Sequence, residues 1–230
     1  MLKRRCTPPT NGYEIIYDDQ PWLSLGKNSN NCYAYAVNDF DFFRIQKSTP
    51  GDTTGKNNTN LPPYYTPAGL RKRILLDNPK KVYSAGACEK CKPKFYKMMM
   101  FIARRGKTKY TFDDFHFYKQ HSEVRYRVQV GDTYTKIARF FAVPVSRVRA
   151  AAAGKLVPNT KIQFKADCFS HKQGYGAGPL LIDAKGKPIR DARFADKNYG
   201  YLNYSTYGGS FCVKNRGIKV GNTYSQFGNK

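Results

Sequence analysis

A cysteine with small and aromatic neighbours stands out near the start of the chain, in the run Asn31-Cys32-Tyr33-Ala34-Tyr35-Ala36. The Asn-rich stretch before it offers N-cap residues, so we expect a short helix from Cys32 to Asn38. Backbone N–H groups at the start of a helix lower the pKa of a thiol and make it nucleophilic. The pattern therefore indicates a thiol that could attack a carbonyl carbon.

A nucleophilic thiol needs a base, and histidine is the usual one. His116 lies in the strand-like segment FDDFHFYK, and His171 lies in FSHK. Either could serve as the base, and Asp183 or Asp191 could orient it. The alternative, which the sequence favours, is that Cys32 is a small core residue and that His116 packs in a sheet.

Cys88 and Cys91 have the spacing of half a zinc site. A tetrahedral site needs two more ligands, which Cys168, His121 or His171 could supply after folding. The alternative is a turn with two reduced thiols. Because the basic start MLKRRCTPPT is followed by no apolar segment, we expect no ordinary secretion signal and no disulfides among the six cysteines.

The segment from Tyr126 to Phe164 forms the most complete local pattern. Alternating Val128 and Val130 predict a half-buried strand, and Gly131-Asp132-Thr133 predicts a turn and a helix cap. Two short helices and a return strand from residue 161 to residue 164 should follow. We therefore expect a β-α-α-β unit.

This unit resembles a LysM domain, which binds glycans that contain N-acetylglucosamine; the opening Tyr-x-Val-x-x-Gly-Asp-Thr and Ile137-Ala138 carry the resemblance. In that family the sugar lies between the loop after the first strand and the loop before the last. The resemblance implies a glycan site formed by Gly131, Asp132, Thr133, Tyr134, Leu156, Val157 and Pro158. The alternative is a structural role for the unit as a spacer.

The rest of the chain predicts an α+β host domain from residues 1–122 and 166–230, with the LysM-like unit inserted as residues 123–165 and a loose tail at 214–230. Thr66-Pro67 should open a helix that ends before Asn78-Pro79. Strands are expected at 95–103 and 110–118, with an exposed loop at 47–64. The Cys-x-x-Tyr-Ala segment resembles the nucleophile segment of CHAP-type amidases, which implies a papain-like host.

Charge is the strongest feature of the composition, with 40 Lys and Arg against 16 Asp and Glu and a formal net charge of +24. Such a field favours polyanionic neighbours. Since the basic residues are dispersed and no DNA-binding motif is present, we do not expect sequence-specific nucleic-acid binding. No cofactor is expected.

The basic, Tyr-rich composition, the Asn/Gly/Pro loops and the LysM-like unit together resemble minor capsid proteins of large icosahedral DNA viruses. That resemblance implies a structural component of the virion, assembled in the host cytoplasm, whose partners are other capsid proteins, the inner membrane surface or N-acetylglucosamine glycans. It is the first of three functional hypotheses. The second is a cell-wall-active cysteine amidase that the LysM-like unit targets. The third is a nucleic-acid binder, which the dispersed charge and the missing DNA-binding motif disfavour.

Overall fold

The computed structural model of the protein describes residues 6–44, 46–58, 64–104 and 113–221. These residues form a mixed α/β fold with one antiparallel sheet. The six strands lie in the order β1-β6-β2-β3-β4-β5. The strands are β1 (Val82–Ala85), β2 (Phe95–Ala103), β3 (Asp114–Arg127), β4 (Lys161–Lys172), β5 (Pro179–Leu180) and β6 (Thr206–Lys214). The helices are α1 (Cys32–Ala36), the 3₁₀ turn η1 (Asp52–Thr54), α2 (Pro67–Asp77), α3 (Tyr134–Phe141) and α4 (Val145–Ala151).

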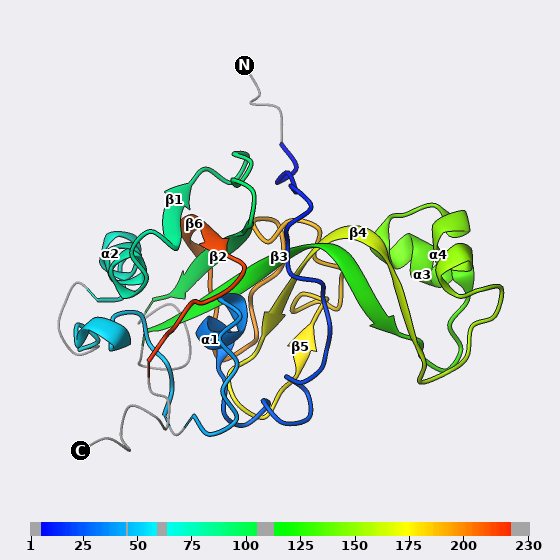
Figure 1. Ribbon diagram of the computed structural model, residues 1–230. Coiled ribbons are helices and arrows are strands. Elements are labelled where there is room, and N and C mark those ends of the chain that lie inside the picture. Colours follow the sequence, from blue (N-terminus) through cyan, green and yellow to red (C-terminus); the bar gives the residue numbers. More distant parts are fainter. Residues whose placement is uncertain (1–5, 45, 59–63, 105–112, 222–230) are drawn as a thin grey trace.

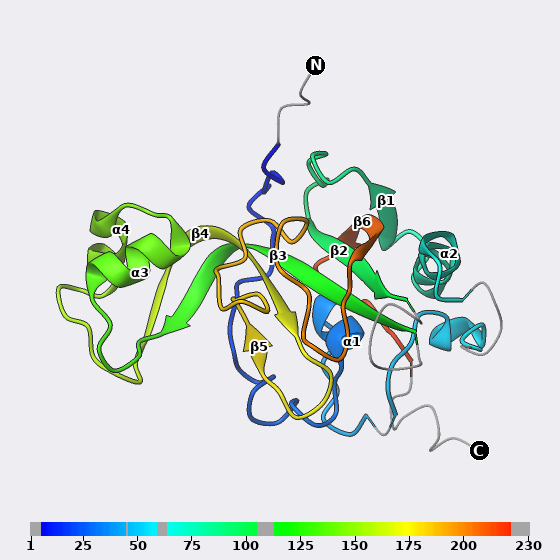
Figure 2. The ribbon, with the colours of Figure 1, turned by 180° about the vertical axis from the view of Figure 1, so that it is seen from behind.

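The two faces of the sheet have different covers. Helix α1 lies against one face, as Figure 1 shows, and its Ala34 and Ala36 pack with Phe115 and Phe117 of β3. Irregular chain between β5 and β6 covers the opposite face, seen in Figure 2, where Tyr118 packs with residues such as Leu202 and Tyr204. Side chains alternate along a strand, so β3 contributes to both cores.

Strands β3 and β4 extend beyond the rest of the sheet and carry α3 and α4 at one end of the molecule (Figure 1). A separate apolar cluster lies there, in which Ile137, Phe141 and Val148 pack against Phe164. The expected β-α-α-β order is therefore present. Both strands run continuously across the predicted boundaries at 122/123 and 165/166, so two paired strands connect this end to the host.

Local signals placed several elements correctly. Helix α2 begins after Thr66, whose side chain accepts a hydrogen bond from the Gly69 N–H, and it ends at Asp77 as expected. Strand β2 has the predicted bounds, and α1 begins at Cys32. The start of the second predicted strand, at 110–112, lies outside the described residues.

Other expectations were wrong. The loop 47–64 is only partly exposed, because Ser48 and Tyr64 are buried. The segment 214–221 is not loose, since Val220 is fully buried and its N–H donates to Asp39; residues 222–230 lie outside the described part. No helix in the described ranges has the length and apolar character to cross a bilayer.

The expectation of six thiols is also wrong, because Cys6 bonds to Cys88 and Cys91 bonds to Cys212. A sulfur in a disulfide has no thiolate to offer a metal, so the half-site for zinc does not exist. The described residues contain no group of three or more potential His, Cys, Asp or Glu ligands. Cys32 and Cys168 are free and buried.

Candidate functional site

Cys32 occupies the first position of α1, and the residue before it is the N-cap. The Asn31 side chain accepts a hydrogen bond of 3.1 Å from the Ala34 N–H and donates one of 2.6 Å to the Ser48 carbonyl. These two bonds fix the start of the helix against the neighbouring loop. The position of the Cys32 sulfur is therefore set from both sides.

Cys32 approaches β3 at its edge. Pairing between β3 and β4 begins at Tyr118, so the stretch of β3 before it has β2 on one side only. The Cys32 thiol donates to the carbonyl of Phe115, in this stretch, at 3.6 Å. A side chain at the edge of a strand can meet residues from either face. Cys32 and His116 accordingly line the same cavity, of about 200 Å³.

His116 and His171, which were rival candidates for the base, are partners. His116 Nε2 lies 2.8 Å from His171 Nδ1, and His171 Nε2 lies 3.0 Å from the Ile182 carbonyl oxygen. Both imidazoles are buried, and the His116 ring packs against Tyr204 with 5.0 Å between the ring centroids. His171 is therefore placed to orient the His116 ring. It holds the place that the sequence assigned to Asp183 or Asp191.

The Ile182 carbonyl determines both tautomers. A carbonyl only accepts hydrogen bonds, so Nε2 of His171 carries the proton and its Nδ1 accepts. His116 must then donate from Nε2, which leaves the lone pair on its Nδ1. His116 therefore has the tautomer of a general base, with Nδ1 as the basic atom.

Burial sets the charge of this site. It lowers the pKa of His116 well below its usual value, with His171 and Lys47 adding to the shift, and it lowers the pKa of His171 to about 4. Burial also raises the pKa of the Cys32 thiol to about 12. The expectation of a lowered thiol pKa is therefore wrong, because a helix of 5 residues has too weak a dipole to overcome desolvation. At rest the site holds a neutral thiol and neutral imidazoles.

Polar side chains complete the wall of the cavity. Lys47 forms an ion pair of 2.9 Å with Asp114, whose other carboxylate oxygen accepts a hydrogen bond of 2.8 Å from Tyr204. Gln173 also lines the cavity. A tetrahedral oxyanion formed at Cys32 could accept hydrogen bonds from the Cys32 N–H, at the helix N-terminus, and from the Gln173 amide.

The predicted third groups serve other purposes. Asp183 accepts from the N–H groups of Lys185 and Lys187 in a turn, and Asp191 pairs with Arg193. The cavity is also lined by residues that the sequence did not indicate, among them Lys47, Asp114, Gln173, Tyr199 and Tyr204. They come from separate segments, and no local pattern connects them.

The two loops predicted to bind glycan lie at the same end of β3 and β4, because Arg127 pairs with Lys161. Thr133 is the N-cap of α3, and Asp132 accepts from the Tyr126 hydroxyl at 2.9 Å and from the Gln129 N–H at 2.7 Å. Asp132 therefore stabilises its own loop. On the facing loop Val157 is 40% exposed, which leaves an apolar surface for contact, and Pro158 beside it is exposed. Gly131 and Tyr134 on one loop and Leu156 on the other complete the predicted set.

Comparisons with known proteins find no matching family model, no similar curated protein and no similar solved structure.

Proposed function

We propose that this protein is a cysteine-dependent amide hydrolase that acts on cell-wall peptides. One observation carries the proposal: Cys32 and His116 line one cavity, and His171 holds His116 in the tautomer of a base. A thiol, a base and an orienting group in this order form the minimum set for acyl transfer to sulfur.

The steps follow from the tautomers. The Cys32 sulfur attacks the carbonyl carbon of the amide while Nδ1 of His116 takes the thiol proton. The resulting oxyanion accepts hydrogen bonds from the Cys32 N–H and Gln173. His116 then gives its proton to the leaving amine, and a thioester forms. Water, deprotonated by His116, hydrolyses the thioester and restores the thiol.

The order of elements supports the two family resemblances. A helix that carries the cysteine comes before an antiparallel sheet whose strand β3 carries the histidine, which favours a papain-like, CHAP-type host. The β-α-α-β order from β3 through β4 favours a LysM-like unit that brings the enzyme to wall glycans. Both assignments belong to the proposal.

The proposal is tested by the release of amines from purified peptidoglycan. We expect the wild type to release amines, and Cys32→Ser and His116→Leu to lower the rate at least about 1,000-fold. Cys168→Ser, the matched control at the other buried free cysteine, should keep the wild-type rate. A folded wild type that releases no amine, or a Cys32→Ser variant with full activity, contradicts the proposal.

A second candidate function is a structural component of a virion. The formal charge of +24 favours it, because a wall hydrolase needs no such excess to perform its chemistry. This function predicts the protein in purified particles at a fixed ratio to the main capsid protein, released by high salt. It predicts the same incorporation for Cys32→Ser.

A further inference from the structure

A cationic pocket lies between α3 and the segment around Pro188, away from the Cys32 cavity. Its volume is about 520 Å³, and its polar wall consists of Thr133, Thr135, Lys136, Arg139 and Arg190. No carboxylate lines it. An open pocket with three cations and two hydroxyl groups suits a ligand that is both anionic and rich in hydroxyl groups.

The positive charge of this pocket is not neutralised within the described part of the chain. Arg190 donates to the Arg139 carbonyl at 3.1 Å, and Lys136 donates to the Gly131 carbonyl at 2.9 Å. These bonds orient the cations but leave their charge in place. None of the three forms an ion pair with a described residue.

Acidic residues near the α3–α4 end lie elsewhere. Asp18 and Asp19 pair with Arg125, Arg127 and Lys161, which belong to β3 and β4. From residue 125 to residue 165 the sequence has nine basic residues and one acidic residue, Asp132, which is already held within its loop. The positive charge on the exposed side of α3 is therefore not balanced by these acidic residues.

The pocket also adjoins the predicted sugar site. Thr133 belongs to the pocket wall and to the loop Gly131–Tyr134, so a chain bound at that loop would continue over Lys136 and Arg139. Phe140 is the one aromatic side chain in the wall, which suits contact with a pyranose ring better than the successive base stacking of a nucleic acid.

We propose that this pocket binds the carboxylates of an acidic glycan that contains N-acetylglucosamine. The inference deepens the proposed function, on which it rests for the glycan, by naming the acidic class of polymer that the protein takes. A neutral glycan would leave three adjacent cations without a partner, whereas each carboxylate can form charge-assisted hydrogen bonds with them.

Hyaluronan and chitin hexasaccharides are matched probes, because both contain N-acetylglucosamine and only hyaluronan carries carboxylates. Calorimetry with the full chain at low salt should show hyaluronan binding at least about tenfold more tightly than chitin. Lys136→Gln, Arg139→Gln and Arg190→Gln combined should abolish this preference.

The control removes the same charge at the opposite end of the molecule. Lys72→Gln, Lys80→Gln and Arg216→Gln combined replace exposed cations on or near α2 and β6, which Figure 1 places far from α3. This variant should keep the preference for hyaluronan. Equal losses in both triple variants would show a general charge effect and overturn the inference.

Two further results would overturn it: equal binding of chitin and hyaluronan, or binding of a DNA hexamer as tight as that of hyaluronan. Cys32→Ser separates this inference from the proposed function, because it should bind hyaluronan like the wild type. Amine release without a preference for hyaluronan would contradict the role of the pocket and leave the proposed hydrolase intact. A preference for hyaluronan in a protein that releases no amine would contradict the proposed hydrolase and leave the role of the pocket intact.

Discussion

At the scale of single residues, the site depends on a chain of hydrogen bonds that ends in the backbone. The Ile182 carbonyl holds the proton on His171 Nε2, and His171 in turn holds His116 as a donor from Nε2. In the proposed mechanism, His171 orients His116 and does not contact the substrate. The basic atom is Nδ1 of His116, which no local sequence feature indicates.

Replacing His171 tests this positioning role. His171→Leu removes the acceptor for His116 Nε2–H, so we expect kcat for amine release to fall about 100-fold while KM changes little. His171→Gln can offer an oxygen acceptor and should recover part of the lost rate. Equal activity of the Leu and Gln variants would contradict the role assigned to His171.

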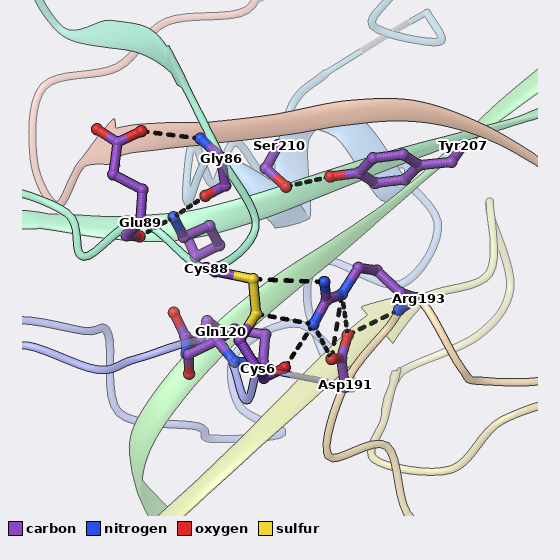
Figure 3. Close-up of a disulfide and its surroundings, with 11 residues drawn as sticks. Cys6, Gly86, Cys88, Glu89, Gln120, Asp191, Arg193, Tyr207 and Ser210 are labelled. Atoms are coloured by element: carbon purple, nitrogen blue, oxygen red, sulfur yellow. Dashed lines mark hydrogen bonds and ion pairs between the residues drawn. A yellow bond between two sulfur atoms is a disulfide. The ribbon is translucent and has the colours of Figure 1, made fainter. Parts of the chain in front are cut away.

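The Cys6–Cys88 disulfide differs from the Cys91–Cys212 disulfide in its exposure and in having an arginine beside its sulfurs. Arg193 lies beside the Cys6–Cys88 bond, with its guanidinium nitrogens 3.5 Å from Cys6 Sγ and 3.7 Å from Cys88 Sγ, as Figure 3 shows. Cys88 is exposed, whereas Cys91 and Cys212 are buried. A nearby cation stabilises the thiolate that leaves when a disulfide is reduced.

We therefore expect a soluble thiol reductant at pH 7 to reduce Cys6–Cys88 at least about tenfold faster than Cys91–Cys212. Mass spectrometry after alkylation of the released thiols measures both rates. Arg193→Gln should slow the first reduction, and Arg190→Gln, an exposed arginine three positions earlier, should not. Similar rates for the two disulfides would show that exposure and the guanidinium have no effect.

At the scale of elements, stability should depend strongly on the N-cap at the start of α1. The Asn31 side chain caps the helix and also bonds to the Ser48 carbonyl. Asn31→Ala removes both contacts, so we expect the free energy of unfolding to fall by about 1–2 kcal/mol. Denaturant titration measures this loss.

The same variant should also displace the Cys32 sulfur. We therefore expect it to lower the rate of amine release even under conditions in which the variant is fully folded. Asn31→Asp keeps the acceptor for the Ala34 N–H and should restore the cap. Normal amine release by Asn31→Ala would show that the cap does not position the sulfur.

The sequence predicts elements whose signals are local. Thr66-Pro67 sets the start of α2, and the alternation in β3 places Phe115 and His116 on opposite faces. The pairing of β3 with β4 is not local, because an irregularity between His121 and Glu123 shifts the register. The contact between His116 and His171 depends on that register, so the sequence left the two histidines as rivals.

The disulfides could not be predicted for a related reason. The short spacing of Cys88 and Cys91 suggested a local pair, but Cys6 lies 82 residues before Cys88 and Cys212 lies 121 residues after Cys91. Only the packing of the N-terminal segment and of β6 brings these partners close. Spacing reports distant contacts poorly when sheet order differs from chain order.

At the scale of the whole molecule, stability should depend steeply on acid. All three histidines, His116, His121 and His171, are buried, and burial lowers their pKa, to about 3 for His121 and about 4 for His171. Below pH 6.5 the histidines of the unfolded chain therefore bind protons, whereas the buried histidines of the folded chain stay neutral. Stability present above pH 6.5 is lost as the pH falls toward 4.

Each such histidine lowers the free energy of unfolding by about 1.4 kcal/mol per pH unit, so the three together lower it by up to about 4 kcal/mol per unit. The raised carboxyl pKa of Asp52 and Asp77 offsets part of this loss at the acidic end. Urea titrations between pH 7 and pH 4 measure the slope. A constant free energy of unfolding over that range would contradict the neutral, buried state of the histidines.

The whole molecule combines a cavity lined by Cys32 and His116, at the start of β3, with a basic α3–α4 end that the long strands β3 and β4 carry. The rates at which Cys32 and Cys168 react with iodoacetamide test the proposed role of this cavity most directly. Both thiols are buried, and Cys32 lines a cavity together with His116. In the folded wild type at pH 7, Cys32 should be alkylated at least about tenfold faster than Cys168, and His116→Leu should remove this difference. Equal rates in the wild type, or a fast Cys32 that His116→Leu leaves unchanged, would contradict the account.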